Sequence, residues 1–483
     1  MDKIHEALNQ IESGNLYPFH MPGHKRQATQ SIWENVYSRD ITEIEGYDNL
    51  HHAEGIIKDE QEYAAKLFGA EESYFLVNGS SCGVLASICA VAESVDLAKD
   101  SACPKILMCR NAHKSAYNGL MLSGAKADYL YPQEIKDYPF VGAIDADDVK
   151  VALERENYAA VFITSPTYEG VVSDIRGICN LAHKKGIPVI VDEAHGAHLG
   201  IWGGDGYFPQ SAIKLGADIV IQSLHKTLPA MTQTAILHVQ GKLINRQRLR
   251  LYLSTFQSSS PSYILMNSIS SCLHFCSENK EKLIQQYKEQ LNNFYEKTEQ
   301  LMRIRVFGPD EDIDRDPGKI IIDATKCRLN GNELSAVLRE TYHLEMEMAA
   351  RDYVIAMTSI MDTEDGFERL WQALKELDAY ERTDQGLPDT SVKTSASLPR
   401  AQSIFSIKEA LSAQGEKLLW KDCKNRISQE FIYPYPPGIP MVAPGEVITG
   451  EILDYMREAK DLGIQLQGPE DYLCESLCCI KEI

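Results

Sequence analysis

The sequence lacks a long apolar run and is short of positive charge. No stretch approaches the roughly 20 consecutive apolar residues that a membrane span needs. The opening residues, MDKIHEALNQIESGN, are amphipathic and charged, unlike the apolar core of a secretory signal. Lysine and arginine number 48 against 69 aspartate and glutamate, so the formal net charge is −21. An acidic surface disfavours nucleic acid and anionic membranes, so we expect a cytoplasmic protein that binds neither.

A dense cysteine framework is also missing. The twelve cysteines are scattered over 483 residues, which fits a reducing compartment better than a disulfide scaffold. Three of them cluster in the tail CESLCC, at Cys474, Cys478 and Cys479. Their spacing matches no familiar zinc pattern, so we interpret this tail as a structural element with buried small side chains and expect no metal.

What the sequence does contain is an alternation of short apolar runs with amphipathic helical segments, between about residues 73 and 240. Hydrophobic residues make up 44% of the chain, enough for a sizeable core and more than one domain. The alternation predicts βαβ units and a mostly parallel sheet covered on both faces, an α/β fold. The expected strands are Tyr74–Val77, Ile106–Cys109, Val161–Thr164, Val189–Asp192, Ile219–Ser223 and Ala235–Val239.

The pattern changes twice along the remainder of the chain. We assign residues 1–254 to an N-terminal segment and a large domain, and residues 255–381 to a smaller α/β domain that opens with a long helical region, Ser268–Met302. Residues 382–403 are rich in Ser, Thr and Pro and predict a linker. Residues 404–483 then form a C-terminal α+β domain, whose stiff segment YPYPPGIPMVAPGE is suited to a pocket wall.

Chemically suggestive residues follow three of the expected strands. Gly79, Ser80 and Ser81 come after the first strand and open a helix, where backbone N–H groups and hydroxyls suit a phosphate. His113 follows the second strand and is suited to stacking on a flat ring. Asp192 ends a buried strand and needs a charged partner. Each has a plainer explanation: a serine helix cap, a surface histidine, or a metal site built from Asp192, His195 and His198.

Lys226 follows the next strand, in the stretch QSLHKTLPAM, with Ser223 and His225 beside it. A desolvated lysine near other cations loses its proton more readily and becomes a nucleophile toward carbonyls. A phosphate cradle, a stacking histidine, a buried aspartate and this lysine at the ends of one parallel sheet together predict a pyridoxal 5′-phosphate (PLP) site. The metal alternative leaves Lys226 and the glycine–serine turn without a use.

Eight stretches make the sequence resemble the Orn/Lys/Arg decarboxylase family, PLP enzymes of fold type I, in the compact form without a receiver-like N-terminal domain. They are FHMPGHKR (19–26), DITEIEGYDNLHHAEGIIKDEQEYAAKLFGA (40–70), FLVNGSSCG (75–83), RNAHKS (110–115), SPTYEG (165–170), VDEAHGAH (191–198), SLHKTLPAMTQ (223–233) and YPPGIPMVAPGE (435–446). The resemblance implies decarboxylation of lysine, arginine or ornithine to the corresponding amine and CO₂. It also implies a homodimer, or a higher homo-oligomer, with the active site at the subunit interface.

The resemblance also implies roles for individual residues. Lys226 would form the Schiff base with the cofactor, Asp192 would face the pyridine nitrogen and His113 would stack on the ring. Gly79, Ser80, Ser81, Ser223 and His225 would hold the phosphate side, with His225 or Lys226 supplying a proton. Ala194 and His195 would lie against the cofactor face; His195 stands where larger family members carry a tryptophan, which weakens any substrate assignment borrowed from them.

Substrate recognition is less well defined by the sequence, which does not choose among lysine, arginine and ornithine. Asp48 is a candidate acid for the substrate cation, or a turn residue in EGYDN, and Glu169 is a specificity residue or a surface acid. An aminotransferase or lyase on the same fold is the main alternative, with Arg351 as a possible clamp for the α-carboxylate. A non-catalytic homologue that has kept the scaffold is another.

Overall fold

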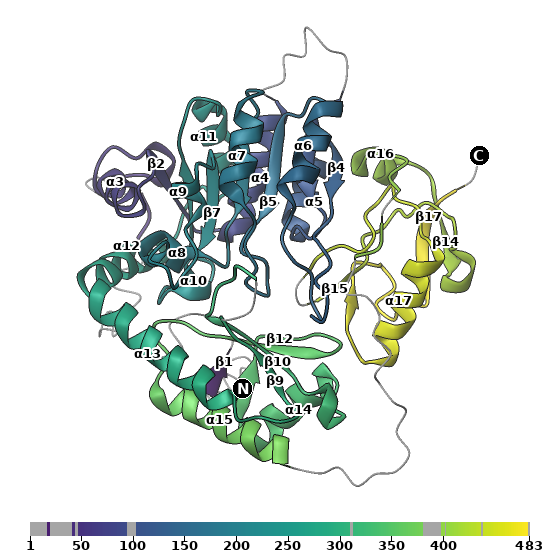
Figure 1. Cartoon of the computed structure of the whole chain (residues 1–483). Coiled ribbons are helices and arrows are strands. Elements are labelled where there is room, and N and C mark those ends of the chain that lie inside the picture. The colour runs from purple at the N-terminus through teal and green to yellow at the C-terminus, as the bar shows by residue number, and fades with distance from the viewer. Residues whose placement is uncertain are drawn as a thin grey trace, which may run out of the picture.

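The computed structural model describes residues 17–19, 41–43, 47–93, 103–309, 313–379, 398–400, 402–435 and 438–481. The PGHKR stretch and most of the expected linker, 382–403, lie outside the described residues. The chain forms three units, which Figure 1 shows as a large domain, a small domain below it and a C-terminal domain to one side.

The large domain is built on a seven-stranded sheet. Strands β3 to β7 are parallel, and only β8 runs antiparallel to its two neighbours. The mostly parallel α/β sheet expected from the sequence is therefore confirmed. The spatial order is β2 (Glu72–Leu76), β8 (Ala235–Val239), β7 (Ile219–Ser223), β6 (Val189–Asp192), β5 (Ala160–Thr164), β3 (Lys105–Cys109) and β4 (Lys126–Leu130).

Strand β4 was not among the expected strands, and its position explains why. It lies at the edge of the sheet, next to β3. Four of its five residues are only partly buried, so the segment KADYL carries no continuous apolar run. An edge strand of this kind gives a weak signal because one side of it faces solvent.

Helices cover both faces of this sheet (Figure 1). Helix α4 packs against the sheet and also against α5 and α11, so a helix that is apolar on nearly all sides is suited to this position. Gly83 allows its close approach, since a Cβ there would lie 2.7 Å from Leu76 Cδ1. The helices are α3 (Ile56–Phe68), α4 (Gly79–Ala92), α5 (Lys114–Ser123), α6 (Ala146–Arg155), α7 (Ile175–His183), α8 (Ala197–Trp202), α9 (Ala212–Leu215), α10 (Leu224–Thr227) and α11 (Arg246–Thr255).

The small domain has a four-stranded antiparallel sheet in the order β12 (Met348–Ala349), β13 (Tyr353–Met357), β10 (Lys319–Asp323) and β9 (Arg305–Phe307). The long helical region expected at 268–302 is two helices that meet at Asn279. The N-terminal strand β1 (Tyr17–Phe19) pairs in parallel with β11 (Leu344–Met346), so this segment lies with the small domain. The helices are α12 (Tyr263–Glu278), α13 (Lys280–Thr298), α14 (Gly331–Tyr342) and α15 (Glu364–Ala379).

The C-terminal domain has a separate apolar core. Two short antiparallel pairs frame it: β14 (Gly415–Leu419) with β17 (Ser476–Ile480), and β15 (Tyr433–Pro434) with β16 (Leu466–Gln467). Its helices are α16 (Ile407–Ser412) and α17 (Gly450–Asp461). In the CESLCC tail, Cys474 and Cys479 are buried in this core and Cys478 is half-buried.

Candidate functional site

Strand β7 ends at Ser223, and Lys226 lies in the short helix α10 that follows it. Its Nζ atom is 2.9 Å from Nε2 of His195. Burial lowers the pKa of the ammonium, while the nearby carboxylates of Asp192 and Glu347 act in the opposite direction. A buried amine that releases its proton more easily than an exposed lysine is suited to attack a carbonyl.

Asp192 and His195 follow the neighbouring strand, β6. Burial raises the pKa of Asp192, and the charge of Lys226 and the Ala194 N–H, which donates to Oδ1 at 3.2 Å, oppose the shift. Burial, followed by the charge of Lys226, holds the pKa of His195 well below its usual range. The imidazole of His195 is therefore neutral, and its buried Nδ1 has no hydrogen-bond partner among the described residues.

His113 caps the N-terminus of α5, directly after β3. Its Nδ1 accepts the Ser115 N–H at 3.2 Å and lies 2.9 Å from Ser115 Oγ. Burial, and then the charges of Lys226 and Lys114, lower the pKa of His113 to about 3. The ring is thus uncharged and fixed in orientation. The C-terminal domain borders it, because Gly438 O accepts the Lys114 N–H at 3.0 Å.

The glycine–serine turn, Asn78–Ser81, starts helix α4 at the carboxyl end of β2. Gly79 has φ +75°, which favours glycine, and its N–H donates to Gln233 O at 2.9 Å. The Asn78 side chain does not cap the helix. Ser80 is half-buried and Ser81 is exposed, so two hydroxyls lie at a helix N-terminus where anions are favoured.

Ser223 and His225 flank the lysine on its own strand and helix. The Ser223 hydroxyl is buried and has no hydrogen-bond partner among the described residues. His225 Nδ1 lies 2.8 Å from Thr234 O, so this nitrogen carries a proton and donates it to the carbonyl. The structure thus brings Lys226 together with Asp192, His195 and His113.

Two further side chains that sequence reasoning did not single out belong to this cluster. The Tyr168 ring contacts His195 with centroids 4.5 Å apart, and its hydroxyl donates to Glu347 Oε1 at 2.5 Å. Glu347 connects β11 and β12 in the small domain, and its charge acts on Lys226. Tyr168 lies inside the SPTYEG stretch, so a signal was present; no motif pointed to Glu347.

The residues expected to contact substrate are engaged in other ways. The Asp48 carboxylate accepts backbone N–H groups from the turn before α3 and from its first residues, including those of Gly55 at 2.8 Å and Ile57 at 2.9 Å, and Asp48 has φ +70°. This is the turn role that the sequence left open. Glu169 accepts the Tyr353 hydroxyl at 2.8 Å.

Arg351 and His198, which the alternative functions required, also have partners. The Arg351 guanidinium bonds to Asp352 and, at 3.1 Å, to Glu458. His198 Nε2 is 3.2 Å from Asp316 Oδ2 in the small domain. Among the described residues, no group of three or more His, Cys, Asp or Glu side chains is placed to hold a metal ion.

Glu193, next to Asp192, is expected to make the unfolding free energy depend on pH. Its buried carboxylate accepts from Ser211, Gln222 and the Ala212 N–H, yet burial raises its pKa to about 7. Because the folded state holds this proton more tightly than the unfolded state, its stabilising contribution is present below about pH 4.5 and is lost as the pH rises to about 7. From pH 5 to 8, wild type should lose about 2 kcal/mol more unfolding free energy than Glu193→Gln. Urea denaturation at both pH values measures this, and parallel losses would contradict it.

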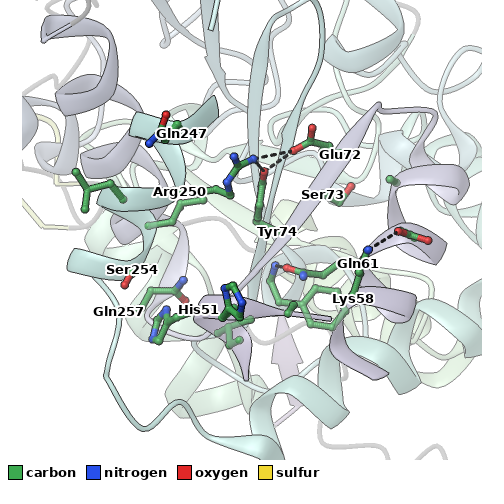
Figure 2. Close-up of a pocket in the computed structure, with 18 of the residues that line it drawn as sticks. His51, Lys58, Gln61, Glu72, Ser73, Tyr74, Gln247, Arg250, Ser254 and Gln257 are labelled. Atoms are coloured by element: carbon green, nitrogen blue, oxygen red, sulfur yellow. Dashed lines mark hydrogen bonds and ion pairs between the residues drawn. The ribbon is translucent and has the colours of Figure 1, made fainter. Parts of the chain in front are cut away.

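A large hollow lies over α3, β2 and α11, away from the strand ends that carry Lys226. It measures about 1310 Å³ and is lined by both polar and apolar groups. Figure 2 shows Arg250 pointing to Glu72 and Tyr74 in its wall. None of the expected cofactor residues lines this hollow, so size alone does not locate the reactive site in this molecule.

A helix-covered sheet of this topology, with its lysine and aspartate at the carboxyl ends of adjacent strands, defines the PLP enzymes of fold type I. Comparison with known families then specifies the protein further. Residues 3–324 match the major domain of Orn/Lys/Arg decarboxylase, and residues 396–472 match its C-terminal domain. The chain belongs to the Orn/Lys/Arg decarboxylase family, as its motifs predicted, and is a decarboxylase of basic amino acids.

Individual relatives agree with this placement. An arginine decarboxylase of Bacillus anthracis is 32% identical and aligns over 99% of this chain and 96% of its own length. The protein YaaO of Bacillus subtilis, described as uncharacterized, is 36% identical over 96% of this chain and 95% of its own. The structure of lysine decarboxylase A from Pseudomonas aeruginosa is similar in fold, with a TM-score of 0.72, 19% identity, and coverage of 92% of this chain and 74% of that one. No helix among the described residues is long and apolar enough to span a membrane.

Proposed function

We propose that this chain decarboxylates arginine to agmatine and CO₂, with PLP bound covalently to Lys226. The buried Lys226 amine beside Asp192 and a neutral His195 is the observation that carries the chemistry. We propose arginine as the substrate, and not lysine or ornithine, because a relative named arginine decarboxylase aligns over nearly the whole chain.

The residues present fit PLP. Two buried polar atoms beside the lysine, His195 Nδ1 and Ser223 Oγ, have no hydrogen-bond partner among the described residues, and such atoms in native proteins normally have one. Burial raises the pKa of Asp192, which a cationic pyridine N–H would reverse. When bound, PLP supplies a ring that accepts the electron pair left by the departing carboxylate.

Each residue of the chain then has a role around that ring. Asp192 would keep the pyridine nitrogen protonated, and the neutral His113 ring would stack on the cofactor. The N-terminus of α4, with Gly79, Ser80 and Ser81, would bind the phosphate, and Ser223 and His225 would assist. Ala194 and His195 would also contact the cofactor.

Proton transfer falls to the groups around Lys226. The neutral imidazole of His195, whose Nε2 lies 2.9 Å from Nζ, would accept a hydrogen bond from Lys226 and hold its side chain in place. Lys226 in its ammonium form would be the donor to Cα and would be left as the neutral amine, because His225 already donates its Nδ1 proton to Thr234 O. Burial of these groups excludes water from the position that must receive a single proton.

Transamination is the alternative with a specific residue to test. It requires a guanidinium free to hold the α-carboxylate, and Arg351 was the candidate. In the structure that guanidinium is paired with Asp352 and Glu458, which favours decarboxylation. The Asp48 carboxylate is likewise taken up by its own turn, so Glu169 is the better candidate for substrate contact.

We also propose a homodimer in the cytoplasm. Leu251 is 60% exposed in the wall of the large hollow over α3, β2 and α11, which offers a face for a second copy. All twelve cysteines are thiols, which suits a reducing compartment. Light scattering should give twice the mass of the chain, and a monomer at micromolar concentration would contradict the dimer.

The test of the proposed reaction is amine and CO₂ release from arginine, lysine and ornithine in parallel, with PLP added. Agmatine as the dominant product supports the proposal, and cadaverine or putrescine would reassign the substrate within the family. Keto-acid formation in place of CO₂ would identify an aminotransferase. No turnover of any of the three by cofactor-loaded protein would favour the non-catalytic homologue.

A further inference from the structure

A second cavity, of about 230 Å³, lies where the three domains meet. The large domain contributes Asn111 and the loop Thr167–Glu169, and the small domain contributes the turn Met348–Tyr353. The C-terminal domain lines it with residues of β15 and α17 and with Ile439 and Met441. Most of its lining is apolar, with polar groups at a few points, which is typical of small-molecule sites.

The charged groups of this cavity are mainly acidic. Glu169, Asp352 and Glu458 are opposed only by the Arg351 guanidinium among the charged residues that line it. Arg351 is already bonded to Asp352 and Glu458. The Glu169 carboxylate accepts one hydrogen bond among the described residues, from the Tyr353 hydroxyl at 2.8 Å, although a carboxylate has about four acceptor positions. The cavity therefore has an excess of negative charge and acceptor capacity remaining at Glu169.

Asn111 provides an independent indication of a ligand. Its side chain is 5% exposed and lines the cavity, and its Oδ1 acceptor has no hydrogen-bond partner among the described residues. A buried acceptor without a partner is unfavourable, so such atoms in native proteins are normally paired. A ligand with N–H donors would satisfy Asn111 and Glu169 together.

The cavity adjoins the reactive lysine. Tyr168 lies in its wall, and the Tyr168 ring contacts His195, whose Nε2 is 2.9 Å from Lys226 Nζ. Asn111 comes two residues before His113 in the same strand-end loop. An aliphatic chain that extends from the reacting carbon past the Tyr168 ring would carry its terminal group toward Glu169.

We propose that this cavity binds the guanidinium or ammonium head of an aliphatic amine, with Glu169 and Asn111 as its acceptors. If the cavity holds the head group of the substrate, this inference rests on the proposed decarboxylation. The same head-group chemistry also occurs in a free amine such as the product, so the experiment has to separate the two sources.

The probes are n-butylguanidine and n-butylamine, which carry the head group but no α-carboxylate. Their binding to the protein without PLP is measured by calorimetry, independently of turnover. Glu169→Gln keeps an acceptor for the Tyr353 hydroxyl and removes one charge, so it should weaken butylguanidine binding about tenfold. Glu368→Gln removes a charge from the surface pair with Lys297 and should leave binding unchanged.

Asn111→Asp is the second variant, and it should tighten butylguanidine binding, a gain that misfolding cannot produce. Equal affinity of wild type and both cavity variants would overturn the proposal.

Steady-state kinetics of Glu169→Gln separate the two sources of the ligand. If this variant loses butylguanidine affinity and its KM for the amino acid also rises, while kcat stays within about threefold, the head group of the substrate occupies the cavity. If KM is unchanged and agmatine inhibits non-competitively, the ligand is the free amine. Absence of turnover in wild type would refute the reaction alone, because the calorimetric result stands without it.

Discussion

Lys226→Ala is expected to abolish both decarboxylation and the visible absorbance of the PLP-loaded protein. The side chain provides the amine that bonds to the cofactor, and no other amine is brought to the same position by β7 and α10 among the described residues. Activity should fall by about a thousandfold or more, on the scale seen when a covalent catalyst is removed. Absorbance spectra and product assays on wild type and variant, both reconstituted with PLP, measure the two effects.

The matched control is Lys185→Ala, just beyond the end of α7, where the ammonium donates to Leu153 O. This variant should keep the wild-type spectrum and rate. Identical spectra for wild type and Lys226→Ala would show that the cofactor is held elsewhere, and the role given to this lysine would be wrong.

The fold was largely predictable because its signals are local. Buried parallel strands are continuous apolar runs, so β3, β5, β6 and β7 were predictable from their apolar residues. Strand β4 was missed because its edge position leaves KADYL polar. The break between α12 and α13 was missed because Asn279 is tolerated inside a helix, and the structure alone shows that the chain turns there.

Site residues were predictable only where each one follows a recognisable strand in the sequence. Lys226, Asp192 and His113 each lie at or after the end of an apolar run, and the carboxyl ends of parallel strands lie at one edge of the sheet. Glu347 follows no such rule: it reaches Lys226 because the small domain folds back over the sheet, 121 residues further along the chain. The cavity at Glu169 depends on three domains, and no local pattern reports a contact made by all three.

A buried ion pair between the large and C-terminal domains gives the largest expected effect on stability. Arg110 Nη1 and Nη2 donate to the two oxygens of Glu446 at 2.7 and 2.9 Å, with 1% and 2% of the side chains exposed. Glu446→Gln leaves the Arg110 guanidinium buried without its counter-charge, so we expect a loss of about 3–5 kcal/mol in unfolding free energy. Guanidinium denaturation of purified wild type and variant measures it.

The double variant Arg110→Met/Glu446→Gln distinguishes a broken charge pair from a general loss of packing. With the cation removed, no uncompensated charge remains, so the double variant should be more stable than Glu446→Gln alone. Because Arg110 begins the loop that carries His113, and Glu446 ends the segment that borders it, the single variant should also weaken PLP binding. A Glu446→Gln protein as stable as wild type would show that this pair does not hold the C-terminal domain against the active site.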